Sequence, residues 1–226
     1  AGISMGMNYE LRPVVGATGT RQATANANAD LGAVQSLAIT PSGGLSCFVD
    51  TFDRANGVPG NNWFVGNEGG TFGNPAITNN RLRLTNASTR VSTYATLQRL
   101  FPGAGNKIII EFLQYSYGGS GADGMAIVLS DAAQAPVAGA FGGSLGYAPK
   151  QTAQGGDVTH EGFSGGWLGI ALDEFGNYSS NTEGRSGGSA PGFTPDSVSI
   201  RGSGSGFTGY AYLRGTGTLP IGIDNA

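Results

Sequence analysis

Charged residues are scarce in this chain, and their scarcity excludes several classes of partner. Asp, Glu, Lys and Arg together make up 12% of the 226 residues, and the formal net charge is -3. A soluble domain ordinarily carries about 25% charged residues. Lysine occurs only at Lys107 and Lys150, and the arginines are scattered along the sequence. Because no basic stripe can follow a row of phosphates, we expect no binding to nucleic acid or to an anionic membrane surface.

A long apolar segment and a second cysteine are also missing. The longest apolar run, 107–113, is interrupted by Glu111 and is far shorter than the roughly 20 residues that cross a bilayer. We therefore predict no membrane span. Cys47 is the only cysteine, which excludes an intrachain disulfide.

Glycine is abundant, with 41 residues, and no long helical period occurs. Short apolar or alternating runs separated by glycine turns are typical of strands, so we predict an all-β fold with one main domain. The run 107–115, with three consecutive isoleucines, is predicted as a central strand covered on both faces. Further strands are predicted at 63–65, 81–85, 93–100, 126–129, 167–172 and 196–201.

The first part of the chain differs in composition from the rest. Residues 1–46 are rich in Ala, Thr, Asn and Gly and have only weak strand-like patches at Met7–Leu11 and Ser36–Ile39. Because this part lacks the apolar residues for a core, we interpret it as an N-terminal extension or the tail of a preceding module. Pro41–Gly44 is predicted to be a linker, and 47–226 is predicted to be the main domain.

One acid stands out in the sequence, because a glycine-rich loop leads to it and a strand comes directly after it. Asp123 is preceded by Gly118, Gly119 and Gly121, and is succeeded by Gly124 and the apolar run 125–129. A flexible loop on a rigid strand is a common design for a binding site. The alternative is a turn carboxylate, since Asp-Gly is also a strong hairpin signal.

Several phrases of the sequence resemble known proteins. Ala122-Asp123-Gly124, with Gly142-Gly143-Ser-Leu-Gly-Tyr147 soon after, resembles the L-type lectins. The phrases 96–105, 142–147 and 166–177 resemble the lectin-like domain of the bacterial MshQ family, which is associated with biogenesis of the mannose-sensitive haemagglutinin (MSHA) pilus. The resemblance covers about 50–219. It implies a concanavalin A-like jelly-roll β-sandwich that is incomplete at its C-terminal edge.

The resemblance also implies a set of carbohydrate-binding residues. Asp123 would accept hydrogen bonds from two sugar hydroxyls, Gly142 or Gly143 would donate an amide, and Asn177 would bind a further hydroxyl. The peptide bond between Ala122 and Asp123 is expected to be cis. An aromatic platform for the apolar face of a sugar is expected from Phe175, Tyr178 or Tyr147, although aromatic residues near strand ends also commonly cover the core.

A calcium ion is a further expectation from the resemblance. In the pattern Asp173-x-Phe175-x-Asn177, the Asp173 side chain, the Phe175 carbonyl and the Asn177 side chain would be ligands. Calcium takes six to eight oxygens at about 2.4 Å, so these three would form half a shell. Many relatives supply another aspartate just beyond the asparagine. Here only Glu183 or Asp196 could stand in for it.

These observations and the resemblance together predict a non-catalytic, calcium-assisted lectin-like module that binds a glycan or polysaccharide. The module is expected in an extracellular or cell-surface protein of a bacterium, with other pilus or surface proteins as further partners. The alternative is a structural or assembly module of the pilus machinery. A glycoside hydrolase is disfavoured, because aligning Asp173 with the central acid of Glu-x-Asp-x-x-Glu places Ala171 and Gly176 where the catalytic carboxylates should be.

Overall fold

The computed structural model describes residues 47–101, 107–118, 120–151, 158–187 and 192–223. The chain divides into two compact units, 1–49 and 50–226, and the second unit holds nearly all of the described residues. The predicted extension 1–46, with its patches Met7–Leu11 and Ser36–Ile39 and its linker Pro41–Gly44, lies outside the described residues.

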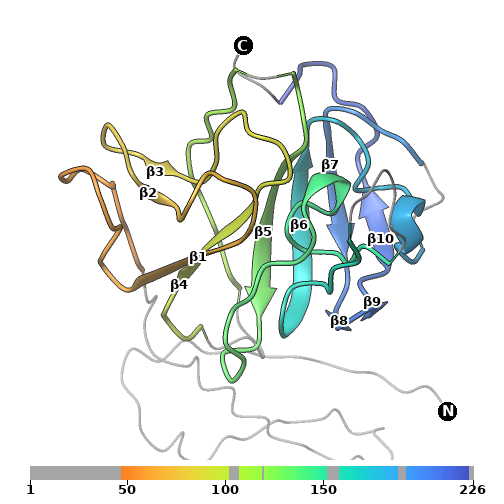
Figure 1. Ribbon diagram of the computed structural model, residues 1–226, viewed down its shortest axis with the longest axis horizontal. Helices are drawn as coiled ribbons and strands as arrows, with labels where there is room; N and C mark the ends of the chain where they lie inside the picture. Colours follow the sequence, from red (N-terminus) through yellow and green to blue (C-terminus); the bar gives the residue numbers. More distant parts are fainter. Residues whose placement is uncertain (1–46, 102–106, 119, 152–157, 188–191, 224–226) are drawn as a thin grey trace, which may run out of the picture. The chain divides into compact units, whose positions relative to one another are not determined.

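The regular secondary structure of the second unit is almost entirely β-strand, so the predicted all-β class is confirmed (Figure 1). Two short 3₁₀ helices, Gly142–Ser144 and Thr182–Gly184, interrupt the loops. Within the described ranges, no helix has the length and apolar content needed to cross a bilayer. The strands are β1 (Trp63–Gly69), β2 (Ala76–Ile77), β3 (Leu82–Arg83), β4 (Ser92–Leu97), β5 (Gly124–Ser130), β6 (Gly166–Asp173), β7 (Ser197–Arg201), β8 (Gly204–Ser205), β9 (Thr208–Gly209) and β10 (Tyr212–Gly215).

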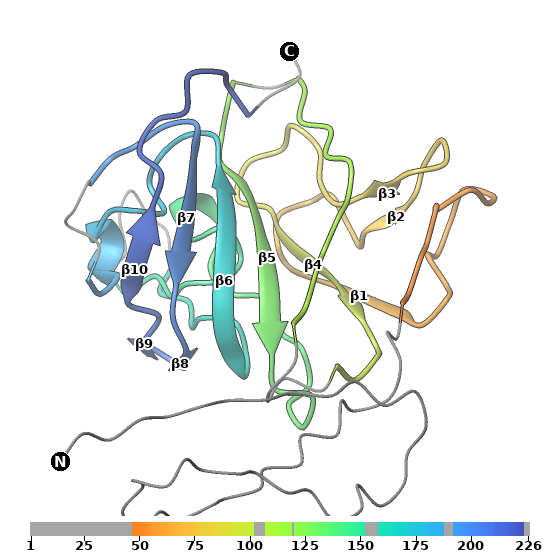
Figure 2. The ribbon, with the colours of Figure 1, turned by 180° about the vertical axis from the view of Figure 1, so that it is seen from behind.

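The largest sheet has four antiparallel strands in the order β10-β7-β6-β5, and Figure 2 shows it from behind. Strands β1 and β4 pair separately, as do β2 with β3 and β8 with β9. The pairing of β5 with β6 sets Gly124 opposite Asp173. The two acidic loops predicted from the sequence therefore meet at one end of this sheet.

The core lies on one face of the four-stranded sheet. Ala171 of β6 is fully buried there, in one cluster with Tyr147, Tyr178 and Tyr210. Gly169 makes room for two of these rings, since a Cβ at this position would lie 2.3 Å from the Tyr147 ring and 2.5 Å from the Tyr178 hydroxyl. Small residues in the middle of β6 thus allow tyrosines to lie directly on the sheet.

The second strand pair is attached to the same core. Tyr94 of β4 packs against the buried cluster and meets Phe163 edge-on, with 6.4 Å between ring centroids. The buried Ser92 hydroxyl donates a hydrogen bond of 2.7 Å to the Gly139 carbonyl. These contacts hold β1 and β4 to the layer that covers the large sheet.

Most strand predictions are confirmed, and one is wrong. Strands β1, β4, β5, β6 and β7 lie on runs predicted from the sequence, whereas the run 81–85 is reduced to the two residues of β3. The run 107–115 is not a strand, and Ile109 and Leu113 are 66% and 83% exposed. β5 pairs with β6 and β4 pairs with β1, so this apolar run is left without a strand partner among the described residues.

Candidate functional site

The site is organised by two loops at one end of the β5–β6 pair. The main-chain carbonyl of Asp123 accepts hydrogen bonds from the amides of Glu174 and Phe175, both at 3.1 Å. These bonds continue the strand pairing beyond Gly124 and lock the two loops to one another. Burial raises the pKa of the Asp173 carboxyl, and the nearby negative charge of Asp123 adds to the effect. The two predicted acids therefore lie close together.

Asp123 presents a carboxylate that is ready to accept hydrogen bonds. The peptide bond between Ala122 and Asp123 is cis, as predicted. The Asp123 side chain is half-buried, and its carboxylate makes no hydrogen bond within the described part of the chain. Burial, and after it the negative charge of Glu183, raises its pKa. A ligand with hydroxyl groups could supply the missing donors.

Asp173 serves its own loop. Its side chain is fully buried, and its Oδ1 and Oδ2 each accept an amide hydrogen bond of 2.8 Å, from Gly176 and Tyr178 respectively. Burial raises the pKa of Asp173 to about 6, even though these two amides favour the ionised form. The carboxylate therefore fixes the turn that carries Asn177.

These contacts bear on the expected calcium ion. Both Asp173 oxygens already accept amide hydrogens, and no group of three or more His, Cys, Asp and Glu side chains with metal-binding spacing occurs among the described residues. Of the stand-in acids, Glu183 forms ion pairs and Asp196 accepts the amide of Ile223 at 3.0 Å. In this conformation, the donor set does not fit a calcium shell of six to eight oxygens.

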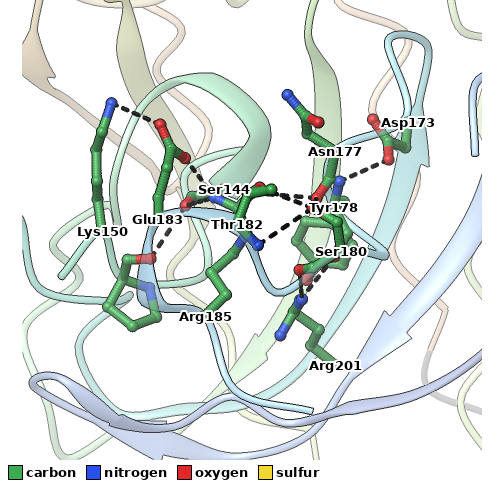
Figure 3. A network of polar contacts seen from close by, with 11 residues as sticks. Ser144, Lys150, Asp173, Asn177, Tyr178, Ser180, Thr182, Glu183, Arg185 and Arg201 are labelled. Carbon is green, nitrogen blue, oxygen red and sulfur yellow. Dashed lines mark hydrogen bonds and ion pairs between the residues drawn. The ribbon is translucent and has the colours of Figure 1, made fainter. Parts of the chain in front are cut away.

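Gly143 and Asn177 are brought together as the resemblance implies. A Cβ on Gly143 would lie 2.3 Å from the Asn177 Cβ, so the glycine loop can approach Asn177 only because it has no side chain. Gly142, with a φ of 72°, begins the 3₁₀ turn there. The Asn177 side chain is half-buried and points away from the polar network in Figure 3, and its amide has no partner among the described residues.

Of the three aromatic residues expected as a platform for a sugar, two lie in the core and one is exposed. Tyr178 and Tyr147 are both fully buried, and the Tyr178 hydroxyl donates to the Gly169 carbonyl at 3.2 Å. Neither ring can be a surface for a sugar, because both are packed on the sheet as core residues. Phe175 is 40% exposed and forms an edge contact with the more exposed Phe193, with 5.4 Å between ring centroids. This pair is the aromatic surface next to the acidic loops.

An ion-pair network of Lys150, Glu183 and Arg185 lies beside the glycine loop and the Asn177 loop (Figure 3). Glu183 meets the Lys150 ammonium at 2.8 Å and the Arg185 guanidinium at 2.6 Å, and both cations are buried. Burial opposes ionisation of Glu183, but its bonds to these two cations outweigh that effect and lower its pKa. Arg185 also donates to the Ser144 hydroxyl at 2.9 Å and to the Asn177 carbonyl at 3.2 Å. The network thus ties the glycine loop to the Asn177 loop.

Arg201 of β7 binds the main chain of the loop after Asp173, at Tyr178 and Ser180. Its side chain is fully buried, and burial lowers its pKa to about 10. The guanidinium donates four hydrogen bonds of 2.7 or 2.8 Å to main-chain carbonyls, and it lies 5.3 Å from the Tyr178 ring centroid. The four carbonyls belong to Tyr178, Ser180, Ser186 and Tyr210.

Sequence reasoning did not find this supporting layer. Lys150, Arg185 and Arg201 are isolated cations in the sequence, with no motif around them. The alternating pattern of 196–201 would place Arg201 on the polar, solvent-facing side with Ser197 and Ser199, whereas the structure buries all three residues. Phe193, beside a glycine-rich loop, carried no signal of its pairing with Phe175.

The comparisons with known proteins do not assign this chain to a family. A scan against protein-family models finds no match, and a search of curated proteins also finds none.

Proposed function

We propose that the unit 50–226 is a non-catalytic carbohydrate-binding module of a bacterial surface or pilus-associated protein. The observation that carries this proposal is the half-buried Asp123 carboxylate, which has no hydrogen-bond partner in the described part of the chain. It lies in a preformed setting, because its main chain is fixed by two hydrogen bonds from the Asp173 loop. An ionised acceptor forms hydrogen bonds roughly twice as strong as a neutral one.

In this proposal Asp123 accepts two sugar hydroxyls, the Asn177 side chain contacts a third, and an amide of Gly142 or Gly143 donates to the ligand. Phe175, in its pair with Phe193, offers an exposed ring to the apolar face of a sugar. A shallow site of this kind is expected to have a dissociation constant from about 1 mM to tens of μM. Adhesion would then depend on many copies acting together.

Calcium remains a prediction of the resemblance, and the contacts of Asp173 argue for a loop that keeps its shape by protein groups alone. The check is the melting temperature of the protein in excess calcium and in excess EGTA. A ligand that binds only the folded state raises stability by an amount that grows with its concentration. An equal melting temperature in both conditions would remove calcium from the proposal and leave the sugar site in place.

The test of sugar binding is a glycan array probed with the protein and with Asp123→Asn. Asp53→Asn is the matched control, because Asp53 is an exposed acid of the same unit. We expect at least one glycan to bind wild type and the control, and to be lost from Asp123→Asn. An array without binders, or equal binding by all three proteins, would contradict the proposal.

One observation favours a second function, a structural or assembly module of the pilus machinery. The segment 107–117 exposes Ile109, Leu113 and Tyr117 at 66%, 83% and 74%. A contiguous exposed apolar stretch commonly marks a protein–protein contact. If the array shows no binder while the protein retains pilus or surface proteins through this segment, the assembly function is the better explanation.

A further inference from the structure

A groove with a volume of about 810 Å³ lies at the end of the large sheet opposite Asp123. Asp131, directly after β5, and Trp167, near the start of β6, are among its lining residues. Asp123 precedes the same strand, so the two acids are separated by about 25 Å at about 3.3 Å per residue. The groove is therefore distinct from the site described above, and its volume lies in the range that holds small ligands.

The walls of the groove are fixed by the main chain. Backbone hydrogen bonds of 2.8 to 3.0 Å join Asp131 to Gly165, Ser164 to Val137 and Gly162 to Gly206. The lining residues fall into three chain segments, 131–138, 159–167 and 203–207, and each of these bonds links two of them. The groove is thus formed before any ligand arrives, which lowers the entropic cost of binding.

Two aromatic side chains line this groove while remaining open to solvent. Trp167 is 57% exposed and Phe207 is 39% exposed. The Trp167 indole N–H has no hydrogen-bond acceptor, and its ring has no aromatic partner, within the described ranges. Tryptophan usually satisfies this N–H or buries its large ring. An open ring with a free donor is a surface on which an amphipathic ligand can lie.

The polar groups of the groove offer acceptors and no strong cation. Neither Glu161 nor Gln134 uses its side chain for a hydrogen bond among the described residues, and Asp131 uses only Oδ1, which accepts the Ala133 amide at 2.9 Å. The lining contains no lysine or arginine from the described part of the chain. Two carboxylates without a balancing guanidinium or ammonium repel phosphates, sulfates and uronic acids, whereas they accept hydrogen bonds from uncharged hydroxyls.

We propose that this groove is a second glycan site and that it binds a neutral oligosaccharide. The apolar face of one sugar residue would lie on Trp167, and the hydroxyls would donate to the carboxylates of Asp131 and Glu161. The inference stands independently of the Asp123 site, since the two share no residue. Two sites at the ends of one sheet would allow a single module to bind two segments of one polymer, which strengthens attachment without any new contact.

The experiment uses tryptophan fluorescence, because the chain contains only Trp63 and Trp167. In a Trp63→Phe background, Trp167 is the sole tryptophan and reports on the groove directly. The protein is titrated with short neutral gluco-, manno- and galacto-oligosaccharides, and with an oligogalacturonate as the anionic control. We expect a saturable shift of the emission with at least one neutral oligosaccharide and none with the oligogalacturonate.

Two variants separate this site from the other. Trp167→Ala, in the otherwise wild-type chain, should weaken binding of the same oligosaccharide at least about tenfold by calorimetry, equivalent to about 1.4 kcal/mol. Its melting temperature should stay close to that of wild type, because the ring is exposed. Asp123→Asn should leave the affinity of the groove unchanged. The inference is overturned if no neutral oligosaccharide shifts the emission, if the oligogalacturonate binds equally well, or if Asp123→Asn abolishes the response.

Discussion

Arg201→Lys is predicted to destabilise the protein strongly, although it conserves the charge. The guanidinium spans four carbonyls with its Nε, Nη1 and Nη2 atoms. A lysine ammonium is a single point with three donors, so it cannot reach carbonyls placed around a planar fork. At least one or two buried carbonyls would then lose their partner.

The magnitude comes from those unpaired groups. A buried polar group without a hydrogen bond costs about 1–3 kcal/mol, so we expect Arg201→Lys to lower the free energy of unfolding by about 2–4 kcal/mol. The whole stability of a domain is about 5–15 kcal/mol. Urea denaturation of wild type and variant, monitored by tryptophan fluorescence, measures the difference through the shift of the midpoint at constant slope.

The matched control is Arg214→Lys on β10. Arg214 is exposed and makes no side-chain hydrogen bond within the described residues, and substitutions at such positions change stability by about 0.5 kcal/mol or less. If Arg201→Lys costs no more than this control, the four carbonyls do not depend on the guanidinium, and the Asp173 loop must be held in another way.

Two further changes test other parts of the structure. Asp50→Asn removes a carboxylate whose pKa is held at about 2, below its ordinary 3.8, by its hydrogen bonds to Arg54 and despite the desolvation of burial. The ionised Asp50 carboxylate adds about 1 kcal/mol to the free energy of unfolding after solvent screening. Because its pKa is lower in the folded state, this contribution is present near neutral pH and is lost as the pH falls from about 4 through 2. The difference in unfolding free energy between wild type and variant should therefore shrink at low pH in urea titrations, and a constant difference would count against it. Gly143→Ala should push the Asn177 loop outward, since the new Cβ has only 2.3 Å to the Asn177 Cβ. We expect weaker glycan binding and a decrease of about 1–3 kcal/mol in the free energy of unfolding. The comparison for steric crowding is Gly73→Ala, because a Cβ at Gly73 meets nothing within 4 Å and only the positive φ adds strain there. Equal losses in the two glycine variants would show that crowding at Asn177 is unimportant.

Patterns along the chain predicted those parts of the molecule that depend on local pairing. The runs that became β5 and β6 are short and apolar, the run that became β7 alternates, and all three have partner strands. The loops beside β5 and β6 met as expected, with a cis bond between Ala122 and Asp123. The run 107–115 is the longest of the predicted strands but has no strand beside it among the described residues. A strand-like sequence shows that a segment is able to form a strand, but it does not show whether another strand lies beside it.

The side-chain layer beneath the site could not be predicted in the same way. Tyr178 stands in the loop sequence beside Asn177, where a ring could face solvent or the sheet. The Tyr178 ring packs on the sheet, because Gly169 has no side chain and leaves room for it. Arg201 is likewise paired with carbonyls from three separate segments, and such long-range acceptors leave no trace in the spacing of residues.

Gly169, in the middle of β6, contacts two tyrosines that lead to opposite ends of the sheet. Tyr147, which rests on Gly169, donates its hydroxyl to the Gly202 carbonyl beside the segment that lines the groove, while Tyr178 rests on the same residue from the Asp173 loop. Even a single methyl group at Gly169 would displace both rings at once. One small substitution at this buried position would then disturb the loops of both proposed sites, and we expect binding at the two sites to weaken together.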